Sequence, residues 1–222
     1  MGASGGFPID LILFGMIAAF LVLRLRGILG KRTGFERPAQ AYAPPTPAQG
    51  APPAAPAVES TGAPVNRTVP EPSTQIGQTL LQMRGVDRSF DAAGFLGGAE
   101  QAFRMIVSGF AAGDRVSLRS LLSDDTYNAF EEAIAAREAA GHTQISEIKA
   151  LESMSIEGAL LRGSVATITV RIVSDQTNLT TDKAGHPVIG TDAVTEITDI
   201  WTFERDLAQR DPTWRLIAAR SA

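Results

Sequence analysis

The apolar positions of this chain fall into three patterns, and the first is an unbroken run near the N-terminus. Residues 7–23 read FPIDLILFGMIAAFLVL, with Asp10 as the one charge. A helix of this length covers about 25 Å, close to the roughly 30 Å hydrocarbon core of a bilayer. Because the run is apolar on every face beyond Asp10, we predict a membrane span rather than a core helix. The predicted anchor residues are Phe7, Leu11, Leu13, Phe14, Ile17, Phe20 and Leu23.

The second pattern places apolar residues three and four positions apart, which predicts helices. A long helix carries a stripe of seven such residues and ends at Gly113, and a short helix follows from Asp114. A third helix begins at Ser123, whose side chain suits an N-cap, and stops at Gly141. An amphipathic segment at residues 76–90 precedes them. The stripe of the long helix consists of Phe95, Ala99, Ala102, Phe103, Ile106, Val107 and Phe110.

The third pattern begins at Thr143, where apolar and polar residues alternate as in strands with one buried face. The clearest strands contain Ile168, Val170 and Ile172, and then residues 197–203; weaker ones fit residues 145–156 and 214–220. Three helices followed by four antiparallel strands predict an α+β domain. A strongly bent sheet wrapped around the long helix would bury both sets of apolar residues.

Composition separates the anchor from this domain. Ten of the thirteen prolines lie in residues 38–72, among Ala, Thr, Gln and Gly, with almost no large apolar residue. Such a segment buries too little surface to offset the entropy lost on ordering, so we predict an extended tether. The chain then divides into an anchor with its basic flank at 1–32, a disordered linker at 33–74 and a folded domain at 75–222.

The charges beside the apolar run predict its orientation. No Lys or Arg precedes the run, and no small-x-small cleavage site follows Leu23, so a cleaved signal peptide is disfavoured. By the positive-inside rule, the basic residues after the run place the C-terminal domain in the cytoplasm. The same residues are candidates to bind anionic lipid headgroups. They are Arg24, Arg26, Lys31 and Arg32.

The domain is acidic and poor in catalytic side chains. Residues 75–222 hold 14 Lys and Arg against 20 Asp and Glu, a balance of −6, which argues against nucleic acid as a partner. The absence of cysteine excludes disulfides, thiolate metal sites and a cysteine nucleophile. The two histidines, His142 and His186, fall in predicted turns and do not make a metal site. We therefore expect no metal, cofactor or catalytic residue.

Asp199 is the candidate that separates a binding protein from an enzyme. It alternates with Trp201 and Phe203 and so faces the same side of its strand. A carboxylate in an apolar interior either pairs with an arginine or takes a raised pKa and can act as a general base. We expect the ion pair, with Arg205, Arg215 or Arg220. The predicted partner-binding or pocket residues are Asp199, Trp201, Phe203, Arg205 and Trp214, although both tryptophans also fit the core.

Three blocks of sequence resemble the Tim44-like domain family. They are FLGGAEQAFRMIVSGFAAGDRVSLRSLLS at 95–123, AIAAREAAGHT at 133–143 and DIWTFERDLAQRDPTWRL at 199–216. The family includes the C-terminal domain of the membrane-adaptor subunit of the mitochondrial presequence translocase, and its bacterial relatives concentrate in alphaproteobacteria. The anchor and the proline-rich linker also resemble the bacterial members. The resemblance implies a cone of the nuclear-transport-factor-two-like fold, with amphipathic helices before it that contact membrane; residues 76–90 either do so or pack against their own domain.

The function implied by this resemblance is that of a non-enzymatic adaptor. Its place would be the bacterial inner membrane, with one span, a periplasmic N-terminus and a cytoplasmic domain. The implied partners are a translocase, chaperone or other membrane-complex component, together with membrane lipid, in protein translocation or membrane-protein biogenesis. Two alternatives stay open: a small-molecule-binding or isomerase-like protein that uses the cone interior, and a ribosome or nascent-chain tether. Convergent polar groups in a pocket would favour chemistry, whereas an apolar groove would favour binding.

Overall fold

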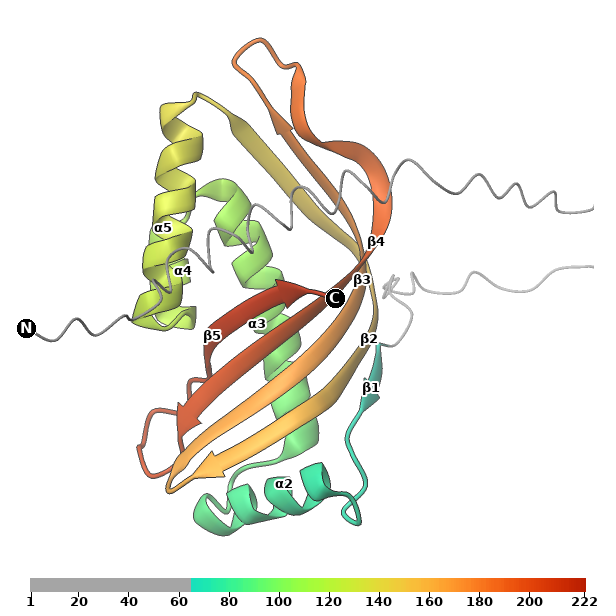
Figure 1. Cartoon of the computed structure of the whole chain (residues 1–222), viewed down its shortest axis with the longest axis vertical. Helices are drawn as coiled ribbons and strands as arrows, with labels where there is room; N and C mark the ends of the chain where they lie inside the picture. Colours follow the sequence, from blue (N-terminus) through green and yellow to red (C-terminus); the bar gives the residue numbers. More distant parts are fainter. Residues whose placement is uncertain (1–64) are drawn as a thin grey trace, which may run out of the picture.

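The computed structural model describes residues 65–222, which contain four helices packed against one five-stranded sheet (Figure 1). The predicted anchor, its basic flank and residues 33–64 of the predicted linker lie outside this range. Among the helices in residues 65–222, none is long and apolar enough to span a bilayer. The helices are α2 (Gln75–Val86), α3 (Ala92–Ala112), α4 (Arg115–Leu121) and α5 (Asp124–Ala139). The strands are β1 (Asn66–Thr68), β2 (Thr143–Arg162), β3 (Val165–Thr181), β4 (Pro187–Asp206) and β5 (Arg215–Ser221).

The sheet follows chain order, β1-β2-β3-β4-β5, and is antiparallel except for the parallel pair β1 and β2. Strand β2 contains three register shifts against β3, and such irregularities bend a sheet. Figure 1 shows the result, in which the long strands curve around α3. The predicted α+β class and bent antiparallel sheet are therefore confirmed. The prediction of three helices and four strands is wrong, because residues 65–222 contain four helices and five strands.

Capping residues mark the ends of α3 and the start of α5. The Asp91 carboxylate accepts a hydrogen bond of 2.6 Å from the Gly94 amide and so caps α3, which ends at Gly113 with a φ of 72°. The Ser123 hydroxyl accepts a bond of 3.3 Å from the Thr126 amide at the start of α5. The predicted stop at Gly113 and the predicted N-cap at Ser123 are confirmed.

The core lies between α3 and the concave face of the sheet. Phe103 and Ile106 of α3 are fully buried against side chains of β2 and β3 such as Met154 and Ile168. Aromatic rings continue this layer toward β4, with ring centroids 4.8 Å apart for Phe103 and Trp201 and 5.9 Å apart for Phe95 and Phe203. Edge-to-face pairs of this kind add to the stabilisation that burial itself provides.

The folded domain begins earlier than predicted. Residues 65–74 were expected to be disordered linker, yet β1 pairs with the outer edge of β2, where Asn66 lies opposite Ser153 and Thr68 opposite Ser155. Val65 also packs against the core. A three-residue strand carries no periodicity that a sequence pattern can detect, which is why the predicted boundary at residue 75 falls too late.

The edges of the sheet differ in how they are covered. Strand β5 pairs only with Asp199–Glu204 of β4, so the preceding part of β4 has an open edge. A register shift interrupts this edge, because the pairs Gln176–Thr195 and Asn178–Thr191 leave three β4 residues opposite one residue of β3. Within this bulge the Thr191 hydroxyl accepts a hydrogen bond of 3.2 Å from the Ala193 amide.

Candidate functional site

The five predicted site residues do not form one site. Trp201 and Phe203 are buried in the core, 5% and 0% exposed. Trp214 is half-buried before β5, and its ring packs against Phe90 at 5.9 Å and against Phe95 at 4.8 Å. The three aromatic residues therefore pack α3, β4 and the start of β5 together.

Asp199 lies on the concave face of β4 without the predicted ion pair. Its cross-strand neighbours are Ile172 on β3 and Ser221 on β5, and the Ser221 hydroxyl donates a hydrogen bond of 3.4 Å to its carboxylate. Burial raises the pKa of Asp199 to about 6, while hydrogen bonds from Ser221 and Gln176 act in the opposite direction. Among residues 65–222, no arginine or lysine forms a salt bridge with this carboxylate, so the predicted ion pair is wrong.

The arginines proposed as partners have other roles. Arg205 forms a salt bridge of 3.1 Å with Asp87 in the turn between α2 and α3, and both side chains are nearly buried, 11% and 14% exposed. Arg215 lies 3.8 Å from Asp211 within the β4–β5 hairpin. Arg220 pairs in register with Ile200, one residue beyond Asp199, so it projects from the opposite face of the sheet.

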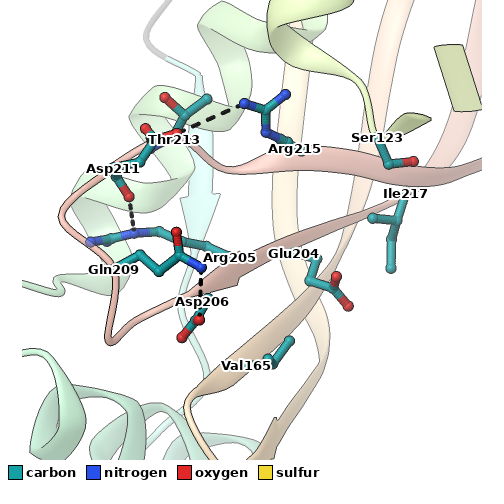
Figure 2. A pocket seen from close by; sticks show the side chains of 10 residues that line it. All are labelled: Ser123, Val165, Glu204, Arg205, Asp206, Gln209, Asp211, Thr213, Arg215 and Ile217. Atoms are coloured by element: carbon teal, nitrogen blue, oxygen red, sulfur yellow. Dashed lines mark hydrogen bonds and ion pairs between the residues drawn. The ribbon is translucent and has the colours of Figure 1, made fainter.

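The pair of Arg205 and Asp87 ties the sheet to the N-terminal helices. The hydroxyl and amide of Ser89 donate hydrogen bonds to Asp87, and together with Arg205 they hold the pKa of this carboxyl below its usual value. Arg205 also donates a hydrogen bond of 3.0 Å to the Asp211 carbonyl. Figure 2 shows Arg205 and Asp211 facing each other across the β4–β5 hairpin. Arg205 thus has a structural role in joining β4 to the turn before α3.

The concave face of β3 changes from apolar to polar beyond Ile172. Ser174 and Gln176 are 0% and 4% exposed, and Gln176 donates a hydrogen bond of 2.9 Å to the Ser174 hydroxyl. Asn178 donates in turn to the Gln176 side-chain carbonyl at 3.1 Å. Sequence reasoning missed these residues, although the alternation that identified β3 continues through them. Ser174, Gln176, Asn178 and Asp199 form a row of polar side chains, which we call the polar row. These side chains form hydrogen bonds mainly with one another.

Arg137 of α5 connects the C-terminal end of α3 to β2. Its guanidinium donates hydrogen bonds of 2.8 and 3.1 Å to the carbonyls of Phe110 and Ala111, the last turn of α3, and it also donates to the Gln144 side chain of β2. Burial lowers the pKa of Arg137, and the Phe110 ring lies 5.2 Å from its guanidinium. These contacts satisfy carbonyls that the end of a helix leaves without partners. The residue stabilises the junction of α3, α5 and β2.

Two hollows are the best formed in residues 65–222, and neither includes the polar row. The larger, about 190 Å³, lies at the β4–β5 hairpin (Figure 2). The smaller, about 130 Å³, lies between α2 and the residues that precede it. The larger hollow is lined by Ser123, Val165, Glu204, Arg205, Asp206, Gln209, Asp211, Thr213, Arg215 and Ile217. The smaller is lined by Val69, Pro70, Pro72, Gly77, Leu80, Leu81, Arg84, Phe90, Asp91 and Ala92.

The surface beside the smaller hollow is apolar and cationic. Val69, Leu81 and Val86 are 37%, 48% and 45% exposed, although Leu80 and Met83 on the other face of α2 are buried in the core. Helix α2 thus packs against its own domain, one of the two readings of residues 76–90, and still exposes Leu81 and Val86 to solvent. We call this surface the α2 corner, formed by Val69, Leu81 and Arg84, which all line the smaller hollow.

The acidic residues near the α2 corner bind to groups other than Arg84 and Arg88. Asp87 is bound to Arg205, and the Asp91 carboxylate caps α3. Within residues 65–222, neither Arg84 nor Arg88 forms a salt bridge, so their positive charges remain available on an otherwise acidic domain. The two histidines lie elsewhere, at the far end of the sheet, where His186 is 3.4 Å from the Asp182 carboxylate.

Comparison with known proteins identifies the family. A family model of the Tim44-like domain matches residues 76–221, whereas no curated protein sequence matches the chain. Among solved structures, the intermembrane space region of the chloroplast protein ARC6 is 15% identical, with a TM-score of 0.44, over 60% of this chain and 96% of that one. A conserved protein from Planctomyces limnophilus DSM 3776 is 17% identical, with a TM-score of 0.30, over 55% and 89%. The match to the family model extends through almost the whole described domain, and the chain belongs to the Tim44-like domain family.

Proposed function

We propose that this protein is a non-enzymatic adaptor of the bacterial inner membrane. One N-terminal span would hold it, and the domain on the cytoplasmic side would recruit a component of a translocase, a chaperone or another membrane complex. Membership of the Tim44-like domain family supports this role. The observation that carries it is the α2 corner, where the exposed side chains of Val69 and Leu81 lie beside Arg84, which forms no salt bridge within residues 65–222.

The chemistry of the α2 corner suits a protein partner with an apolar, acidic surface. Exposed apolar side chains grouped with cations supply both buried area and charge complementarity on binding. An anionic lipid surface offers the same two features, and the corner lies next to the residues that lead toward the predicted span. We therefore assign the corner to partner binding at the membrane surface.

A photo-crosslinking amino acid at Leu81 in the full chain, expressed in native membranes, tests the assignment. We expect a discrete protein adduct from position 81 and none from Val116 of α4, which is 85% exposed and serves as the matched control. Adding Arg84→Glu should abolish the adduct because the corner then carries the wrong charge. Equal capture at both positions would overturn the assignment, and an adduct with lipid alone would replace the protein partner by the membrane.

The predicted orientation needs its own experiment. A reporter that is active only in the periplasm, fused after Ala222, should give no signal if the domain is cytoplasmic. The same reporter fused before residue 7 should be active. A strong periplasmic signal from the C-terminal fusion would reverse the topology and remove cytoplasmic partners from consideration.

A second candidate function rests on Asp199. A buried carboxyl with a raised pKa beside hydrogen-bonding amides is a feature of ligand pockets and of general bases. Binding of a small polar molecule would raise the thermal midpoint of the wild type but not that of Asp199→Asn. A screen of polar metabolites that shifts both proteins equally, or neither, would leave the adaptor role as the only proposal.

A further inference from the structure

The first ten described residues form a distinct element, which we call the strap (residues 65–74). The strap enters along the outer edge of β2 as β1, passes over the smaller hollow and joins α2 (Figure 1). All three residues of β1 are exposed, and they cover only Ser153, Met154 and Ser155 of a twenty-residue strand. Its two ends are held in different ways.

The lower end of the strap, residues 71–74, is built into the start of α2. The Thr74 hydroxyl donates a hydrogen bond of 2.8 Å to the Glu71 carbonyl and accepts one of 3.0 Å from the Gly77 amide. The Glu71 carbonyl approaches Gly77 so closely that a Cβ there would lie 2.0 Å from its oxygen. Gln78 also donates to the Pro72 carbonyl. This end cannot leave without disrupting the first turn of α2.

The upper end, residues 65–70, is held by backbone pairing, by the packing of Val65 against the core and by one ion pair. The Arg67 guanidinium reaches Glu100 on α3 at 2.5 Å, and Arg104 holds the same carboxylate at 3.1 Å. Glu100 is 14% exposed, whereas Arg67 is 43% exposed. A short parallel strand with an exposed arginine is a weak attachment compared with the capped, close-packed lower end.

We propose that the strap is releasable: residues 65–70 peel from β2 while α2, α3 and the rest of the sheet stay folded, and the Arg67–Glu100 pair sets how readily this happens. Release frees six residues, which span about 20 Å when extended. It also uncovers the β2 edge at Ser153–Ser155 and one wall of the smaller hollow. The strap thus determines how far the domain can extend from the preceding part of the chain. It also determines whether the β2 edge at Ser153–Ser155 is accessible.

Hydrogen exchange on the full chain in detergent micelles tests the proposal. Glu100→Ala removes the ion pair while placing a strong helix former in α3. We expect amides of residues 66–69 and 153–155 to exchange about tenfold faster in this variant, with β3 and β4 unchanged. Arg104→Ala is the matched control, because it removes the second arginine from the same carboxylate and leaves the strap contact in place.

A covalent lock gives the reverse test. Thr68 and Ser155 are register partners, and the chain has no cysteine of its own, so Thr68→Cys with Ser155→Cys can be oxidised to one defined disulfide. In the Glu100→Ala background this disulfide should restore slow exchange at residues 66–69 and 153–155. Unchanged exchange in Glu100→Ala, or equal acceleration throughout β2, β3 and β4, would overturn the proposal, since the strap would then open only with the whole domain.

Discussion

Among single residues, Asp199 has the clearest energetic consequence. Its carboxyl is buried between Ile172 and Ser221 with hydrogen bonds but no cation in residues 65–222, and its pKa is about 6 instead of the ordinary 3.8. Between these two values the folded protein binds a proton that the unfolded chain releases. The folded state is therefore favoured at low pH, and this contribution is lost as the pH rises through about 6.

Asp199→Asn should stabilise the domain at neutral pH. The shift of the pKa corresponds to about 3 kcal/mol between the folded and unfolded states, and the amide removes this cost without changing the shape of the side chain. We expect a gain of up to about 3 kcal/mol at pH 7 and almost none below pH 4. Urea titrations at both pH values measure it, provided that the m-value stays constant. A less stable variant at pH 7 would indicate a cationic partner or a ligand.

The Asp87–Arg205 salt bridge leads to the opposite dependence on pH. The pKa of Asp87 is held below 3.8, so its contribution is fully present above that value and is lost as the pH falls below it. Asp87→Asn and Arg205→Met should each lower the urea midpoint at pH 7. The double variant should lose less than the sum of the two, because the residues share one interaction. Strictly additive losses would show that the two side chains act independently.

The sequence predicted correctly which face of a strand a residue occupies, because a local pattern determines it. It did not predict the ion-pair partner of Arg205, because that partner is distant in the chain. The alternation in β4 placed Asp199 on the same face as Trp201 and Phe203. The partner of Arg205 is Asp87, on an element far away in the chain, and no spacing rule connects the two. Arg205 was expected to pair with Asp199 because the two residues lie on the same strand, and Arg215 and Arg220 because they lie on the next one.

At the scale of elements, helix ends were predictable and strand partners were not. Caps are local chemistry, so the boundaries at Ser123 and Gly113 followed from the residues themselves. Strand β1 has three residues and gains its stability from β2 and Glu100, which lie far along the chain. A sequence pattern contains no information about such an element.

Two glycines provide a test of helix packing. Gly98 lies inside α3, and a Cβ there would meet nothing within 4 Å, so Gly98→Ala should stabilise the domain by about 1 kcal/mol. Gly77→Ala should destabilise it, because the new Cβ would overlap the Glu71 carbonyl. Denaturant midpoints of the two variants compare them directly. A loss of stability in Gly98→Ala would mean that a side chain at position 98 interferes with a contact outside residues 65–222.

At the scale of the whole molecule, the strap changes where the domain begins. Chains that start at residue 65 and at residue 75 differ in β1, in the Arg67–Glu100 pair and in the Thr74 cap of α2. Loss of a cap alone costs about 1 kcal/mol, which corresponds to roughly 2–4 °C in a domain of this size. We expect the shorter chain to melt at least that much lower in calorimetry. Equal melting temperatures would show that the strap contributes nothing to the fold.

The bulge in β4 matters wherever many copies of this chain are concentrated on one surface. Two flat, unpaired strands that meet edge to edge can zip together and continue the sheet from one molecule into the next. In β4, three residues crowd opposite one, and the Thr191 hydroxyl already occupies the Ala193 amide that a second molecule would need. The extra residues also twist the strand out of the plane in which an incoming neighbour could align. The bulge therefore disfavours edge-to-edge pairing of two copies along this part of β4.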